Sequence, residues 1–178
     1  DGGYGSSEYR YVVAYDPDGG FVTGGGWIDS PPGAYTADES LTGKASFGFV
    51  SKYKRGAQVP TGVTQFQFQV ADLNFHSESY DWLVIAGARA QYKGVGTING
   101  EGQYKFKLTG VDADINDHDS IAVDRFRIKI WWEVEPEGDG EAVEHVVYDN
   151  GLDADDYPDD PTTGTTEIGG GSIVIHKK

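Results

Sequence analysis

Residues 124–134 read DRFRIKIWWEV, and the alternation within this stretch indicates the class of fold. Every second residue from Phe126 onward is apolar, and the residues between them are charged apart from Trp131. Successive side chains of a β-strand point to opposite faces, so the pattern predicts a strand with one buried face and one wet face. The stretch GQYKFKLTGV at 102–111 shows the same alternation of apolar and polar residues. Both are therefore expected to be half-buried antiparallel strands.

The stretch TQFQFQVADLNF at 64–75 alternates in the same way until Val70, after which the apolar residues change parity. An extra residue in a strand produces such a change, so we expect a β-bulge near Ala71 and Asp72. Further apolar, β-branched or aromatic runs predict strands at 9–15, 20–28, 44–53, 81–87, 88–98, 144–149 and 171–177.

About ten strands, separated by turn sequences such as NGEG at 99–102, predict an all-β fold. The chain has 26 glycines and shows no amphipathic helix longer than a turn or two. An antiparallel β-sandwich is the expected architecture, and a jelly-roll or barrel is the alternative. The expected core residues are Phe47, Phe49, Phe66, Phe68, Phe106, Phe126, Ile128 and Ile130.

The 178 residues are long enough for one substantial core, so we expect a single β-sandwich domain at 9–178 after a flexible lead at 1–8. The absence of cysteine excludes disulfides and thiolate metal sites. No signal-peptide pattern is present, and no apolar run reaches the ~18 residues that a membrane helix needs. We therefore expect a mature or excised soluble piece that does not insert into a membrane.

Negative charge is concentrated in one part of the chain. Residues 112–160 hold 17 acidic and 3 basic side chains, a net charge of −14, while the whole chain carries −15. Such a field repels nucleic acid and anionic membrane surfaces and attracts cations. Nucleic-acid binding is therefore excluded.

Oxygen-bearing side chains recur at every second position in DADINDHDSIAVD at 112–124. A helix-loop-helix calcium site needs glycine at its sixth position and glutamate at its twelfth. This stretch has Asp117 and Val123 there, which excludes that kind of site. An irregular oxygen cage for Ca²⁺ is the expectation, and a solvated acidic loop is the alternative. The predicted ligands are Asp112, Asp114, Asn116, Asp119 and Asp124.

A second acidic stretch, NGLDADDYPDDP at 150–161, offers Asp153, Asp155 and Asp156 as further ligands. Carboxylates crowded into two loops of one domain repel each other, and bound cations would relieve the repulsion. A shared or adjacent calcium site is one expectation. A loop that only adds solubility is the other.

Catalytic signatures are missing from the sequence. The four histidines are scattered, and neither Gly-x-Ser-x-Gly nor His-Glu-x-x-His occurs. The acids lie mostly in loops away from aromatic strand faces, so we expect a protein that is not an enzyme.

Three aromatic residues are candidates for a binding surface. Trp131 falls on the polar parity of its strand, and Tyr80 and Trp82 flank Asp81. A flat exposed ring can stack on a sugar or on a neighbouring domain. The alternative is that these rings pack under a loop.

Two long blocks carry a resemblance to a known family: TGKASFGFVSKYK at 42–54 and FQFQVADLNFHSESYDWLV at 66–84. With shorter matching stretches over nearly the whole chain, the sequence resembles the post-COAP type of β-module. Such modules recur near the C-termini of secreted and surface-exposed bacterial multidomain proteins. The resemblance implies an extracellular location and a modular role, with no enzymatic activity. The loops at 112–123 and 133–145 are longer and more acidic than the family pattern.

The expected function is that of a non-catalytic structural or adhesive module of an extracellular bacterial surface protein or fibre, stabilised by calcium. The alternative is a carbohydrate-binding module that uses Trp131 or Trp82. Expected partners are neighbouring protein modules or surface polysaccharide. The apolar strands predicted at 9–15 and 171–177 either seal the edges of their own sheet or exchange head to tail between molecules to form a filament.

Overall fold

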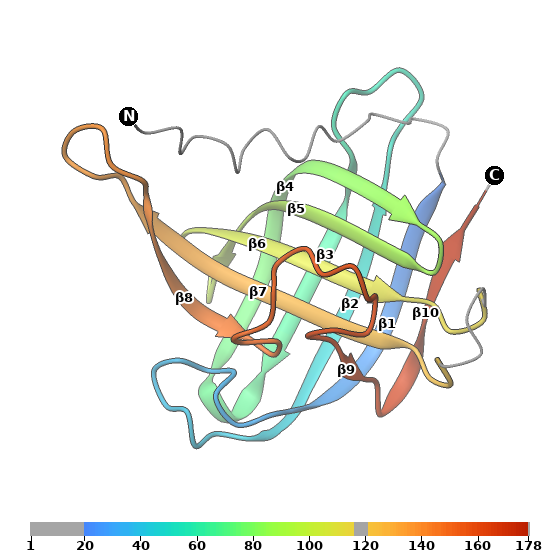
Figure 1. The fold of residues 1–178 in the computed structure, drawn as a ribbon, viewed down its shortest axis with the longest axis horizontal. Coiled ribbons are helices and arrows are strands. Elements are labelled where there is room, and N and C mark those ends of the chain that lie inside the picture. Colours follow the sequence, from blue (N-terminus) through green and yellow to red (C-terminus); the bar gives the residue numbers. More distant parts are fainter. Residues whose placement is uncertain (1–19, 116–120, 178) are drawn as a thin grey trace.

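The computed structural model describes residues 20–115 and 121–177 (Figure 1). The strands are β1 Phe21–Ser30, β2 Gly43–Lys52, β3 Thr61–Phe68, β4 Leu73–Ala86, β5 Arg89–Ile98, β6 Glu101–Val111, β7 Arg125–Val134, β8 Val143–Asp149, β9 Thr166–Glu167 and β10 Gly170–His176. Across these described residues, no helical segment has the length and apolar character needed to cross a membrane. The lead predicted at 1–8 and the strand predicted at 9–15 lie outside the described residues.

The strands form one antiparallel sheet. β1 to β8 lie side by side in chain order, β10 adds to the free side of β1, and the short β9 pairs with β7. The prediction of an all-β antiparallel fold with about ten strands is confirmed. The sheet is continuous and curls around its own core, so its two halves face each other without being two separate sheets (Figure 1).

The core lies inside the curl, where aromatic side chains from distant strands meet. Phe126 of β7 stacks on Phe47 of β2 with ring centroids 4.1 Å apart, and its ring lies 6.1 Å from that of Phe66 in β3. β3 to β6 separate β2 from β7 within the sheet, so these contacts require the sheet to fold back on itself. All eight predicted core residues are buried: Phe47, Phe49, Phe66, Phe68, Phe106, Phe126, Ile128 and Ile130.

The chain reverses direction at residues 69–72, where the sequence predicts a bulge. A 3-10 turn over Gln69–Ala71 is followed by Asp72 in the left-handed conformation, with φ 51°. β4 then runs back along β3, which places Phe75 opposite Phe66. The predicted bulge is therefore wrong, because the change of parity comes from a tight turn between two strands.

Both ends of the curled sheet contact another part of the chain. At one end, the chain leaves β9 beside β7 and crosses to β1, where β10 pairs along the free edge. At the other end, the loop after β1 covers the edge of β8. The main-chain amide of Asp149 donates to the carbonyl of Ala34 at 2.9 Å, and that of Thr36 donates to Val147 at 3.2 Å.

Candidate functional site

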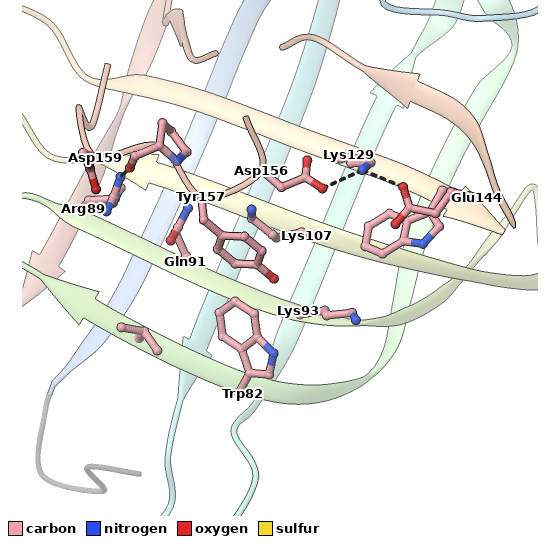
Figure 2. A pocket seen from close by; sticks show the side chains of 13 residues that line it. Trp82, Arg89, Gln91, Lys93, Lys107, Lys129, Glu144, Asp156, Tyr157 and Asp159 are labelled. Carbon is pink, nitrogen blue, oxygen red and sulfur yellow. Dashed lines mark hydrogen bonds and ion pairs between the residues drawn. The ribbon is translucent and has the colours of Figure 1, made fainter. Parts of the chain in front are cut away.

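A pocket of about 620 Å³ lies on the outer face of the sheet (Figure 2). Its lining comes from β4 to β8 and from residues 156–159, which belong to the segment between β8 and β9. This segment crosses the outer face of β6 and β7 (Figure 1). Trp82, Trp131 and Asp156, three of the residues singled out from sequence, meet in this pocket.

Three lysines form a row across the strands of the pocket. Lys93 of β5 is the register partner of Lys107 in β6, and Lys107 is in turn the partner of Lys129 in β7. Side chains directly opposite one another on neighbouring strands share a face of the sheet. Like charges at such positions repel each other, so the row needs anions close by.

Lys129 has two such anions. Its ammonium donates to Glu144 Oε2 and to Asp156 Oδ2, each at 2.9 Å. Burial alone would lower the pKa of Lys129, but the hydrogen bonds to the two carboxylates outweigh it and raise the pKa. Burial would raise the pKa of Asp156, but the hydrogen bond from Lys129 and the charge of Lys129 lower it. Both groups are therefore charged at neutral pH.

Arg127 holds the segment between β8 and β9 against the sheet. Its Nε and Nη2 donate to the two carboxylate oxygens of Asp149 at 3.0 and 2.9 Å, and both residues are buried. Its Nη1 donates to the carbonyl of Asp155 at 2.8 Å. A bidentate guanidinium–carboxylate pair has a fixed geometry. The following residues, Asp156 and Tyr157, are thereby positioned over the lysine row.

Lys107, in the middle of the row, is buried without an anion of its own. It is 6% exposed, and its ammonium has no hydrogen-bond partner among the described residues. The nitrogen lies 3.8 Å from the centroid of the Tyr157 ring, within cation–π range. Burial lowers the pKa of Lys107 to about 8. This side chain was not among the candidates from sequence.

The aromatic part of the lining comes from Trp82, Trp131 and Tyr157. Trp131 points to the outer face as its parity predicts, but it is only 4% exposed. The ammonium groups of Lys93 and Lys129 lie 5.6 and 5.1 Å from its ring centroid. For Trp131 the packing alternative therefore holds, while Trp82 and Tyr157 are half-buried rings that border the cavity.

Tyr80, the third aromatic candidate, lies in the core instead. It is 6% exposed, and its hydroxyl is hydrogen-bonded to Thr64 Oγ1 at 2.8 Å. β4 has a bulge between Tyr80, which pairs with Gly94, and Trp82, which pairs with Lys93. Residues two apart normally share a face, but the bulge sends these two rings to opposite faces of the sheet.

The acidic stretch at 112–124 contributes to the closure of the sheet. Asp112 Oδ2 accepts the main-chain amide of Ile175 at 2.8 Å, and Asp124 Oδ2 accepts that of Ile173 at 2.7 Å. Asp112 Oδ1 accepts the main-chain amide of Asp114 at 3.0 Å, and Asp124 Oδ1 accepts that of Ala113 at 2.8 Å. These two carboxylates therefore bind the edge of β10.

Of the three remaining calcium ligands predicted in this stretch, the structure describes one, Asp114. Asp114 is exposed, and Asn116 and Asp119 lie outside the described residues. Within residues 20–115 and 121–177, no group of three or more His, Cys, Asp or Glu side chains is placed to hold a metal ion. Calcium binding stays a prediction.

The second acidic stretch lies against the pocket. Asp153 is exposed and has φ 70°, Asp155 accepts the amide of Tyr157 at 3.0 Å, and Asp156 pairs with Lys129. Two of these three predicted calcium ligands thus serve to place the segment over the lysines.

The chain was compared with protein-family models, with curated proteins and with solved structures. None of the three comparisons found a match.

Proposed function

We propose that this chain is a non-catalytic binding module of an extracellular bacterial surface protein or fibre, and that its outer-face pocket binds a saccharide. The observation that carries the proposal is the meeting of half-buried aromatic rings with charged and amide side chains in one cavity. Trp82 and Tyr157 supply the rings, and Gln91 with the lysine row supplies the polar groups (Figure 2).

The chemistry of sugars fits such a lining. One face of a pyranose ring is a plane of C–H groups that packs on an aromatic ring, while its hydroxyls need donors and acceptors at the rim. A cavity of about 620 Å³ is within the size range of small-molecule sites, which are typically apolar pockets with a few placed polar groups. Surface polysaccharide is therefore the partner class that we propose.

The location and modular role rest on the resemblance to the post-COAP type of β-module. Structural calcium belongs to the same proposal, supported by the run of oxygen ligands at 112–124 and by the net charge of −15. The negative field of the chain also favours an ion-rich exterior environment, where divalent cations offset it.

A glycan array probed with the chain tests the proposal. We expect binding to at least one saccharide, and a loss of about tenfold or more in affinity for Trp82→Ala, because the stacking surface is removed. Trp132→Ala is the matched control, since Trp132 is exposed and stacks on His145 outside the pocket lining. Absence of binding to every saccharide, or equal losses for the two variants, would refute the proposal.

A further inference from the structure

The lysine at the centre of the pocket is in an unusual state for a buried charge. Among the described residues, Ser51 Oγ and Lys107 Nζ are the buried side-chain polar atoms without a hydrogen-bond partner. An ammonium has three donors, and burying it without an acceptor is strongly unfavourable. A group of this kind inside a cavity indicates that its acceptor arrives with the ligand.

The two carboxylates whose charges act on Lys107, Asp156 and Asp149, already pair with other groups. Asp156, the carboxylate whose charge most raises the pKa of Lys107, accepts hydrogen bonds from Lys129 at 2.9 Å and from Arg127 at 3.4 Å. Asp149 is held in its bidentate pair with Arg127. Neither carboxylate accepts a hydrogen bond from the Lys107 ammonium, which instead lies 3.8 Å from the centroid of the Tyr157 ring.

The charge balance of the lining sets the charge of the missing acceptor. The lining contains four basic side chains, Arg89, Lys93, Lys107 and Lys129, and three acidic ones, Glu144, Asp156 and Asp159. One positive charge is left over in a chain that is otherwise strongly negative. A ligand group with a single negative charge balances it, whereas a phosphate dianion would meet three carboxylates with only one cation to spare.

We propose that the pocket selects acidic saccharides, and that Lys107 binds the carboxylate of a uronic acid unit. This inference rests on the proposed saccharide-binding function and names its ligand class. The sugar ring packs against Trp82 and Tyr157 while the carboxylate accepts hydrogen bonds from the Lys107 ammonium. Binding then gives the buried charge the partner that the free protein lacks.

The test uses matched pairs of oligosaccharides that differ only in the carboxylate. Suitable probes are tri-galacturonate, tri-mannuronate and a glucuronate-containing hyaluronan tetrasaccharide, each with its carboxyl-reduced neutral form. Affinities are measured by calorimetry or by NMR titration. We expect at least one acidic probe to bind about tenfold or more tightly than its neutral form, because the charged hydrogen bond is lost on reduction.

Lys107→Met removes the charge and keeps the length of the side chain, so it should abolish the preference for the acidic form. Lys105→Met is the matched control: Lys105 is on the same strand and the same face, but it pairs with Glu133 at 2.6 Å and does not line the pocket. The control should keep the preference.

The pH profile gives a second readout. Lys107 binds a carboxylate in its protonated form, so the affinity of the acidic probe should fall as the pH rises above 8, where Lys107 loses its proton, and level off once the preference for the acidic form is lost. The neutral probe should show no such fall. The ionisable groups that face Lys107 are Lys93, Arg127, Lys129, Asp149, Asp156 and Tyr157.

The outcomes separate the two proposals. Equal binding of acidic and neutral forms, with no change in Lys107→Met, would leave saccharide binding intact and overturn the carboxylate assignment. Stronger binding of a sulfated sugar than of any uronate would also overturn it. Failure of every probe, acidic and neutral, refutes the saccharide function, and the inference falls with it.

Discussion

At the scale of single residues, Lys107 links stability to binding. Its neighbours Lys93 and Lys129 lie directly opposite it, and among the described residues Lys129 alone of the three lysines donates hydrogen bonds to carboxylates. Lys107 is therefore a buried cation, and no group among the described residues accepts a hydrogen bond from its ammonium. Such a group destabilises the free protein in proportion to the lowering of its pKa.

Replacing Lys107 by Met should stabilise the free protein. The pKa of Lys107 is about 8 in the folded chain, against 10.5 for an unperturbed lysine. Below pH 8 both states bind the proton, and the folded state carries the full penalty, ~3 kcal/mol. Between pH 8 and 10.5 only the unfolded chain keeps the proton, so the stability of the wild type rises and the advantage of the variant shrinks.

Urea unfolding of the two proteins at pH 7 and pH 10 measures this difference. The comparison between variants cancels the contributions of the buried tyrosines, which titrate in both. A Lys107→Met protein that is less stable than the wild type at pH 7 would show that the ammonium has an acceptor in solution.

The residues of the pocket differ in how far sequence could identify them. Trp82 and Trp131 could be chosen as aromatic candidates from their positions alone. Lys107 could not, because an exposed lysine is the ordinary occupant of a wet strand face, and its burial depends on a segment some fifty residues away. Alternation puts Tyr80 on the same face as Trp82. The structure puts Tyr80 in the core, because a bulge lies between the two residues and the alternation does not reveal it.

At the scale of strands, β10 is held by side chains as well as by β1. The amides of Ile173 and Ile175 donate to the carboxylates of Asp124 and Asp112, which follow β6 and precede β7. These carboxylates act as acceptors where a further strand would otherwise supply carbonyls. Buried amides that lose such an acceptor are costly to leave unpaired.

Asp112→Asn should loosen β10 locally. Asp112 is 4% exposed and accepts two main-chain amides, but an asparagine offers one oxygen and turns an NH₂ group toward the other amide. We expect a loss of about 2 kcal/mol in the free energy of unfolding. Hydrogen exchange at Ile175 should become faster than at amides of β3.

Asp114→Asn is the control for this measurement, because the Asp114 carboxylate is exposed and only its main-chain amide contacts Asp112. Unchanged exchange at Ile175 in Asp112→Asn would contradict a role for this carboxylate in holding the strand.

Strand prediction succeeded where alternation is strict. It failed at residues 69–72, where a turn between two strands changes the parity of the apolar residues as a bulge would. β2, β6 and β7 match their predicted residues closely. β2 buries every second side chain, as alternation predicts, but β6 and β7 each bury six consecutive residues, because the segment between β8 and β9 covers the face that was expected to be wet. The turn at 69–72 contains neither glycine nor proline, so the sequence does not mark it as a reversal. The lysine row depends on the register of three strands, which no single stretch encodes.

At the scale of the whole molecule, calcium should stabilise the fold if the stretch at 112–124 binds it. With a dissociation constant of ~0.1 mM, typical of extracellular modules, ~10 mM calcium adds ~2.7 kcal/mol to the free energy of unfolding. Asp114→Asn should reduce this gain without changing stability in chelator, because its carboxylate takes no part in the closure of the sheet. An equal melting temperature in calcium and in chelator would refute calcium binding.

Assembly depends on whether the curled sheet needs the strand predicted at 9–15. The edge of β10 contacts Asp112 and Asp124, and the edge of β8 contacts the loop that follows β1, so the described residues leave neither edge wholly uncovered. β10 also pairs with β1 of its own chain, so the predicted C-terminal strand docks in its own sheet. We therefore expect a chain lacking residues 1–19 to fold, with a melting temperature lowered by less than about 4 °C.

Sedimentation of the full and the truncated chain then decides the role of the removed segment. Head-to-tail exchange of a strand does not close on itself, so it makes oligomers that grow with concentration. If the full chain associates and the folded truncated chain does not, the segment at 9–15 pairs with a neighbouring molecule. If the truncated chain is unfolded, that strand belongs to its own sheet, and assembly into a filament would have to use a different surface.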